Sequence, residues 1–364
     1  MMKRTICTAL VLGSVFCGSA LQADEAHRPR LFAQFGEMVN TPDGMALDAK
    51  GDLYLSSPNF QDKNFPGVIL RRCSKTGTWS VFTPALLHPE TRAAGPMGIA
   101  FGPDGNLYYC DNQYFNNRNY KSRILRVLVA DDGAPLRIEP VVENVKFANG
   151  IRFRGNDLFF TDTCFDLPGR AVGGVYRVPM SAFRERPARL LPKDRAEKDP
   201  FFLGAIETQV LKKRNDLAAA DGLCLAANGD LYTGSFGCGN FYKLARRPDG
   251  TYEKPKLLLS DPSVFSCCDG ICYYEKKNWI IMADSAKNAI RYWDIGKERQ
   301  GAAAAFGTLW ENDDVTGEDG LLDQPCEVLV FEGNKLLVAN FDLKFPDLKN
   351  TSNDRVHTIS VIDL

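Results

Sequence analysis

The chain has 364 residues, of which 45% are hydrophobic and 24% charged, so a mostly disordered chain and a membrane-embedded bundle are both excluded for its bulk. Its 44 basic and 45 acidic residues give a net charge of −1, which is not the charge of a nucleic-acid-binding surface, and no nucleic-acid partner is expected. Histidine occurs three times, as His27, His88 and His357, and this excludes a histidine-rich metal centre.

Residues 1–23 have the pattern of a secretory signal peptide. Two basic residues begin the segment, an apolar stretch runs over residues 5–16, and small residues follow. The apolar stretch is too short to cross a bilayer as a stable helix, and cleavage is expected after Ala20 or Ala23. The sequence therefore predicts export to the periplasm or secretion, with no membrane attachment after cleavage.

Nine cysteines remain once the signal peptide is removed. In an oxidising compartment we expect some of them to pair, and the odd number leaves at least one free or joined to another chain. The adjacent Cys267 and Cys268 are expected to be buried free thiols rather than a strained disulfide. Their surroundings lack the spacing of a zinc site, so zinc is not expected.

The clearest feature of the sequence is a pattern that occurs six times. Each copy has a turn ending in glycine or its equivalent, an apolar run, a tight turn and a second apolar strand. The copies lie at residues 43–57, 97–111, 149–162, 221–235, 269–285 and 326–340. A third strand follows each copy and a fourth follows the first five, so the repeating unit is a four-stranded sheet.

A four-stranded sheet that recurs about every 50 residues is typical of a β-propeller blade. Six repeats predict an all-β, six-bladed β-propeller over residues 29–364. The sixth repeat ends on its third strand, and we expect residues 30–35 to supply its outer strand and close the ring. The longer interval after the third repeat predicts an insertion at residues 181–220, with helical spacing over residues 202–217. It is either a lid over one face or a solvated loop.

The residue before the repeated glycine should lie at one rim of the central tunnel, because the first strand of each blade lines the axis. These rim residues are Asp43, Met97, Asn149, Asp221, Asp269 and Cys326. Crowded carboxylates raise one another's pKa unless a cation joins them, and oxygen ligands of this kind suit Ca²⁺. Asp-Gly and Asn-Gly are also common turn sequences. Their shared register nevertheless favours a metal site formed by Asp43, Asn149, Asp221 and Asp269.

With these repeats and rim residues the chain resembles the gluconolactonase and regucalcin-type six-bladed propellers, over roughly residues 29–364. The resemblance implies a central Ca²⁺, or another divalent cation. Asp43 falls at the position of a first-blade Glu ligand, Asn149 matches the third-blade ligand and Asp221 the fourth-blade ligand. Asp269 is our own addition from the fifth blade. Met97 stands where the family has Asn, and a thioether is a poor ligand for a hard cation.

The resemblance also implies an activity, that of an exported metal-dependent lactone hydrolase. In that reaction Ca²⁺ polarises the lactone carbonyl and Asp221 activates water or attacks directly. The partner would be a small-molecule substrate, with a sugar lactone as one candidate. A non-catalytic propeller that binds a ligand or protein, and a related ester or organophosphate hydrolase, stay open as alternatives. Asp162 and Asp284, at the ends of second strands, are expected to cap those ends rather than to catalyse.

Overall fold

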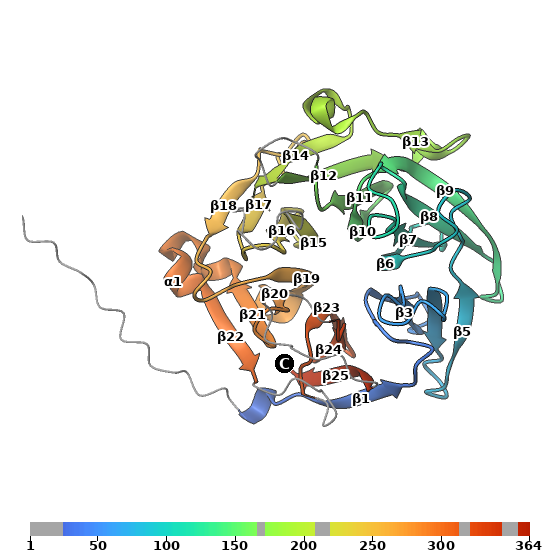
Figure 1. Ribbon diagram of the computed structural model, residues 1–364. Coiled ribbons are helices and arrows are strands. Elements are labelled where there is room, and N and C mark those ends of the chain that lie inside the picture. Colours follow the sequence, from blue (N-terminus) through green and yellow to red (C-terminus); the bar gives the residue numbers. More distant parts are fainter. Residues whose placement is uncertain (1–24, 166–171, 208–218, 313–320, 344–355) are drawn as a thin grey trace, which may run out of the picture.

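Six mainly antiparallel sheets form a ring around a central tunnel (Figure 1). The structure is a computed structural model that describes residues 25–165, 172–207, 219–312, 321–343 and 356–364. The signal peptide predicted at residues 1–23 lies outside these ranges. The fold is the six-bladed β-propeller that the sequence repeats predict, with one sheet for each repeat.

The strands of each blade follow one another outward from the tunnel. Blade 1 contains β2 (Met45–Leu47), β3 (Leu53–Ser57), β4 (Val68–Arg72) and β5 (Trp79–Pro84). Blade 2 contains β6 (Pro96–Phe101), β7 (Leu107–Asp111), β8 (Ser122–Val129) and β9 (Pro135–Val145). Blade 3 contains β10 (Ala148–Arg154), β11 (Asp157–Asp162), β12 (Val172–Pro179) and β14 (Phe202–Glu207).

The remaining three blades have the same order. Blade 4 contains β15 (Ala220–Leu225), β16 (Leu231–Ser235), β17 (Phe241–Leu244) and β18 (Lys256–Leu259). Blade 5 contains β19 (Cys268–Tyr274), β20 (Trp279–Asp284), β21 (Ala289–Asp294) and β22 (Phe306–Glu311). Blade 6 contains β23 (Pro325–Phe331), β24 (Lys335–Asn340) and β25 (His357–Asp363), followed at its outer edge by β1 (Arg30–Phe35).

The N-terminal strand β1 therefore belongs to the last blade. It pairs antiparallel with β25, with Arg30 opposite Val361 and Phe35 opposite His357. The Phe32 ring also meets the Phe331 ring edge-on, with 5.7 Å between centroids. One sheet thus contains both ends of the described chain, and the outer edge of β25 is covered.

Helical structure in the described residues is short and peripheral. The elements are η1 (Glu25–His27), η2 (Met180–Phe183), η3 (Lys193–Lys198), η4 (Glu275–Lys277), η5 (Ile295–Gln300) and α1 (Ala302–Ala305). No helix in the described ranges has the length and apolar character needed to cross a bilayer.

The insertion after blade 3 differs from our expectation. Residues 202–207 were predicted to begin a helix, but they form β14, which pairs with β12 as the outer strand of blade 3. The prediction was wrong there because the open edge of β12 needs a fourth strand, and this pairing overrides the local spacing. The rest of the predicted helix, residues 208–218, lies outside the described residues. Within the insertion, η3 and the two-residue strand β13 (Ala188–Arg189), which pairs with β9, precede β14.

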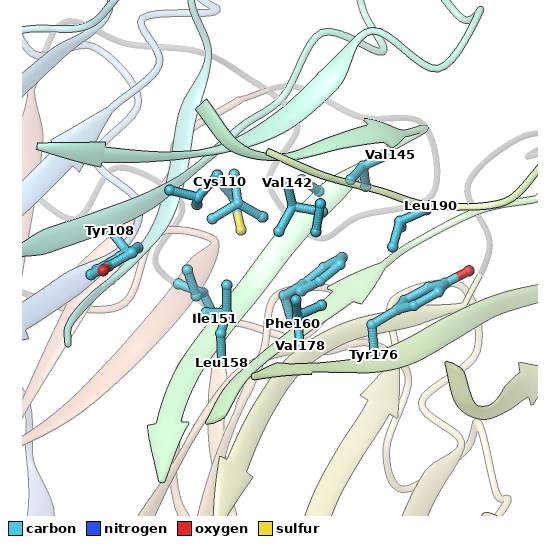
Figure 2. Close-up of a cluster of buried hydrophobic side chains, with 14 of the residues drawn as sticks. Tyr108, Cys110, Val142, Val145, Ile151, Leu158, Phe160, Tyr176, Val178 and Leu190 are labelled. Atoms are coloured by element: carbon cyan, nitrogen blue, oxygen red, sulfur yellow. The ribbon is translucent and has the colours of Figure 1, made fainter. Parts of the chain in front are cut away.

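The hydrophobic core lies between neighbouring blades rather than along the axis. Figure 2 shows the cluster between blades 2 and 3, where Phe160 and Tyr176 stack with 5.2 Å between ring centroids. Cys110 and Ile151 pack into the same cluster from β7 and β10. The burial of these side chains fixes each blade against the next, and so fixes where the first strands meet around the tunnel.

Glycine at the start of the first strand in five of the six blades allows the inner strands to approach closely. A Cβ on Gly222 would lie 2.4 Å from the Asp269 carbonyl oxygen, and one on Gly150 would lie 2.7 Å from that of Asp221. Only a residue without a side chain fits such a contact. The repeated glycine is therefore a packing requirement of the ring, and the residue before it is placed at the tunnel mouth.

All nine cysteines of the described residues are free thiols, and eight of them are buried. The disulfides that we expected among them are therefore wrong for this structure. Cys267 and Cys268 are two buried free thiols, as predicted.

Candidate functional site

A small pocket opens at the tunnel mouth, with a cavity volume of about 30 Å³. Its wall contains all six rim residues that the repeats predict, namely Asp43, Met97, Asn149, Asp221, Asp269 and Cys326. The other lining residues are Phe115, Phe147, Thr163, Phe236, Gln324 and Phe341. The four predicted metal ligands therefore converge on one pocket, together with an apolar wall of phenylalanine rings.

Hydroxyl groups from second strands hold the backbone of this rim. Ser56 Oγ donates to the Met97 carbonyl oxygen at 2.5 Å, and Thr161 Oγ1 donates to that of Asp221 at 2.6 Å. In each case the donor belongs to the preceding blade. These bonds satisfy carbonyl groups that the tunnel mouth would otherwise leave buried and unpaired, and they fix the direction of the adjoining side chains.

Two of the rim carboxyls are buried, with Asp43 7% and Asp221 3% exposed. Burial raises the pKa of Asp43 well above its ordinary value, and the charges of Asp269 and Glu327 raise it further. The pKa of Asp221 is raised in the same way, first by burial and then by the charges of Asp269 and Asp43. Both shifts disfavour the ionised form of these two carboxyls in the absence of a cation.

Asp269 is the most accessible member of this group. Burial raises its pKa to about 7, against the opposing effect of Ser285, whose Oγ donates to Asp269 Oδ2 at 2.7 Å. The Asp269 and Asp221 carboxyls also share a hydrogen bond, which favours the proton on Asp221. Asp269 and Asp221 thus behave as a pair in which one proton is shared between two carboxyls.

One buried polar atom of the pocket lacks a partner in the protein. Among the described residues that line the pocket, Thr163 Oγ1 is buried and makes no hydrogen bond. An unpaired buried polar atom costs roughly 1–3 kcal/mol, so this hydroxyl indicates a bound ligand, ion or water at the pocket.

The oxygen donors of the pocket fit a hard cation. Three carboxylates and an amide face one small cavity, which is the donor set that Ca²⁺ prefers. A cation would also relieve the repulsion that raises the pKa values of Asp43 and Asp221. Among the residues described, no three acidic, imidazole or thiol side chains stand together as a ready set of ligands. The Asn149 amide would therefore have to complete the coordination with two carboxylates.

A charged pair lies deeper in the tunnel, below the pocket. Arg152 Nη2 in β10 is 3.3 Å from Glu327 Oε1 in β23, and it also donates to the Ile271 carbonyl oxygen at 3.2 Å. Burial raises the pKa of Glu327, and Arg152 opposes this shift. Glu327 occupies the position at which the other five repeats have glycine.

The aspartates at the ends of second strands make structural hydrogen bonds, which reach the segment before a first strand rather than cap their own strand ends. Asp162 Oδ1 accepts from the Phe147 backbone N–H at 2.8 Å, and Asp284 Oδ1 accepts from that of Cys267 at 3.1 Å. Each carboxyl therefore holds the segment that leads into the first strand of its own blade.

Sequence reasoning missed several residues of the site. Thr163 comes directly after the strand-ending Asp162, and only the three-dimensional structure shows that its hydroxyl lacks a partner. Arg152 had a recognisable signal, because it is the one basic residue among the six that stand two positions after the repeated glycine or Glu327. The aromatic wall comes from loops, which the strand repeats do not describe.

No protein-family model matches the chain, and no curated protein matches it. Solved structures do match. A PQQ-bound aldose sugar dehydrogenase from Streptomyces coelicolor is 17% identical with a TM-score of 0.61, covering 93% of this chain and 99% of that one. A gluconolactonase from Xanthomonas campestris is 14% identical with a TM-score of 0.54, covering 94% of this chain and 96% of that one.

A calcium-binding regucalcin from Agrobacterium tumefaciens is 11% identical with a TM-score of 0.56, and the match covers 93% of each chain. The chain shares the propeller fold of these proteins. Gluconolactonase and regucalcin structures are thus among its relatives in fold, as the sequence resemblance predicted. At these identities the likeness establishes the architecture, and the chemistry must be argued from the pocket itself.

Proposed function

We propose that this protein is a metal-dependent hydrolase of the lactonase type that acts at the tunnel-mouth pocket. The observation that carries the proposal is the convergence of Asp43, Asp221 and Asp269 with the Asn149 amide on one small cavity. Carboxyls are rarely buried together without a function, because each disfavours the ionisation of the others. The structural relatives include a gluconolactonase and a calcium-binding regucalcin, which is consistent with this chemistry.

In this proposal Asp43, Asn149 and Asp221 hold a divalent cation, Ca²⁺ being the best match to their oxygens, and Asp269 lies beside them. When bound, the cation supplies Lewis-acid stabilisation of negative charge on a carbonyl oxygen. The unpaired Thr163 hydroxyl is available to donate to a substrate oxygen in the same pocket.

Asp221 acts as the general base on water, or as the nucleophile, once it is ionised. Its hydrogen-bond partner Asp269 is held in turn by Ser285, so the direction of the carboxyl pair is fixed. A base with a raised pKa accepts a proton readily near neutral pH, provided that enough of it is ionised.

The size of the pocket limits what enters it. A cavity of about 30 Å³ admits one functional group rather than a whole sugar. Phe115 is 39% exposed, so its ring forms part of the solvent-facing border of the entrance. We therefore place the reacting carbonyl inside the pocket and the remainder of a small-molecule substrate outside it. Export to the periplasm or medium belongs to the same proposal and rests on the signal-like N-terminus.

The test is hydrolysis of a lactone panel, glucono-δ-lactone included, with Ca²⁺ present. We expect Asp221→Asn to lower kcat at least about a hundredfold, because the base or nucleophile is lost. Asp131→Asn makes the same chemical change at an exposed position and should leave kcat unchanged. Wild-type rates in Asp221→Asn would refute the proposal. A phosphotriester and an aryl ester in the panel separate the related hydrolase from the lactonase.

A propeller that binds a ligand without catalysis is the second candidate. The thioether of Met97 in the pocket wall and the four phenylalanines favour it, since they make the site less suited to a hard cation. Substitution Met97→Asn adds an oxygen donor and should raise Ca²⁺ affinity if a cation belongs in the pocket. Met97→Leu is the matched control. Unchanged affinity in Met97→Asn would favour the binding candidate.

A further inference from the structure

A second, larger cavity lies beside the tunnel-mouth pocket. Its volume is about 420 Å³, within the usual range of small-molecule sites, and it lies between loops of blades 1 and 2. We name it the side groove and define it by Phe60, Lys63, Asn64, Leu87, Arg92 and Asn116. These residues belong to the loop between β3 and β4, the segment between β5 and β6, and the loop between β7 and β8.

The side groove is cationic. Its lining includes Lys63 and Arg92 but no carboxylate. Both side chains are exposed, and neither forms an ion pair with any residue that the structure describes. The amides of Asn64 and Asn116 add neutral hydrogen-bonding groups. Two unpaired cations beside amide donors are an arrangement that attracts and hydrogen-bonds an anionic group.

One aromatic side chain separates the side groove from the tunnel-mouth pocket. Phe60 lines the groove, and its ring lies 5.0 Å from that of Phe115 and 6.5 Å from that of Phe341, centroid to centroid. Phe115 and Phe341 line the tunnel-mouth pocket. A small molecule that lies across Phe60 would therefore reach both cavities.

The loop that presents Arg92 is held in one conformation. Arg92 has a φ of 59°, in the left-handed region that side chains other than glycine seldom adopt. Its backbone N–H donates to the His88 carbonyl oxygen at 2.9 Å, and His88 Nδ1 accepts from the Glu90 N–H at 3.1 Å. These hydrogen bonds hold the turn at Arg92, whose side chain lines the groove.

We propose that the side groove binds an anionic group, a carboxylate or a phosphate, joined to an apolar portion that packs on Phe60. This goes beyond the reaction assigned to the tunnel-mouth pocket. It rests on the proposed function in one respect, namely that the anionic group belongs to the substrate. The reacting carbonyl of that substrate would then lie in the tunnel-mouth pocket, on the other side of Phe60. The preferred substrate class is then an acidic lactone or ester rather than a neutral sugar lactone.

Binding of small probes to the whole mature protein tests the groove without any catalytic step. Calorimetric titrations in metal-free buffer at low ionic strength compare phenyl phosphate, benzoate and the neutral benzyl alcohol. We expect both anions to bind more tightly than benzyl alcohol, and salt to weaken them. The double variant Lys63→Gln/Arg92→Asn should weaken anion binding about tenfold or more, since two charged contacts are lost. Asn suits the left-handed backbone at position 92.

Two matched variants make the result specific. Lys75→Gln removes one charge from the exposed turn at the opposite end of β4 and should bind as the wild type does. Asp221→Asn should also keep anion binding, because the groove is separate from the reacting pocket. Binding of phenyl phosphate without binding of benzoate identifies a phosphate as the ligand. Equal binding of the two probes identifies carboxylates as ligands too. Absence of anion binding by the wild type, unchanged affinity in the double variant, or loss in Asp221→Asn overturns the inference. None of these results depends on whether the protein hydrolyses lactones.

Discussion

Arg152 and Glu327 face each other across the tunnel, with 3.3 Å between Nη2 and Oε1. They come from blades 3 and 6, which lie on opposite sides of the ring (Figure 1). The pair therefore joins the two halves of the propeller below the tunnel-mouth pocket. Because Glu327 also contributes to the raised pKa values of Asp43 and Asp221, the pair belongs to the electrostatics of the site.

Replacing one partner of this pair should destabilise the protein more than replacing both partners with apolar residues. We expect Arg152→Met to lower the free energy of unfolding by about 3 kcal/mol, because it leaves a buried carboxylate without its partner. The double variant Arg152→Met/Glu327→Met should lose less than the sum of the two single variants. Urea denaturation of all four proteins measures the coupling. Strict additivity would show that the pair does not act as a unit.

The contacts between inner strands predict a strong effect at the ring glycines. Gly222→Ala places a Cβ 2.4 Å from the Asp269 carbonyl oxygen, so we expect a loss of about 3 kcal/mol or more in the free energy of unfolding. Gly36→Ala is the control, because nothing lies within 4 Å of its added Cβ. It should change stability by less than about 0.5 kcal/mol. Similar thermal denaturation of the two variants would contradict the packing argument.

Two threonines in neighbouring positions should respond in opposite ways. The Thr163 hydroxyl is buried and unpaired, so Thr163→Val should leave stability unchanged or raise it by about 1 kcal/mol, while weakening the binding of a ligand in the pocket. Thr161→Val removes the donor to the Asp221 carbonyl and should lower stability by about 1 kcal/mol or more. A loss of stability in Thr163→Val would mean that its hydroxyl has a structural partner.

The raised pKa values of the rim carboxyls predict how the free energy of unfolding of the cation-free protein changes with pH. The pKa of Asp269 is about 7 in the folded state and about 4 in an unfolded chain, so between these values the folded protein holds more protons. The free energy of unfolding should therefore fall as pH rises from 4 to 7. Asp43 and Asp221 shift in the same direction.

A bound cation should offset the loss of stability that accompanies ionisation of the rim carboxyls. We expect the rise in Tm on adding Ca²⁺ to be larger at pH 8 than at pH 5, because the carboxyls must ionise to bind the ion. Asp269→Asn should flatten the pH dependence of stability in cation-free buffer. Calorimetric melting at several pH values checks both statements, and a Ca²⁺ effect that grows toward acid pH would contradict them.

The sequence predicted the blades well because their strands repeat with a constant register. The third strand expected after each repeat is present, for example as β4 after the first repeat and as β21 after the fifth. The outer strand β14 was mistaken for helix, since its local spacing gave no sign that the edge of β12 would need a partner. Local pattern decides a strand only where tertiary pairing agrees with it.

The candidate site was predictable in part for the same reason. The register before each glycine led directly to Asp43, Asn149, Asp221 and Asp269 at one pocket. Phe60 was not predictable because its importance depends on the position of a loop. Thr163 was not predictable because its importance depends on the lack of a hydrogen-bond partner for its hydroxyl. A strand repeat carries no information about either.

The most direct test of the central claim is calorimetric titration of Ca²⁺ into the purified mature protein at pH 8. If the rim carboxyls of separate blades share one ion, the wild type should bind a single Ca²⁺ per chain, and Asp221→Asn should bind it at least tenfold more weakly. Absence of binding in the wild type, or equal affinity in the two proteins, would contradict a cation at this pocket.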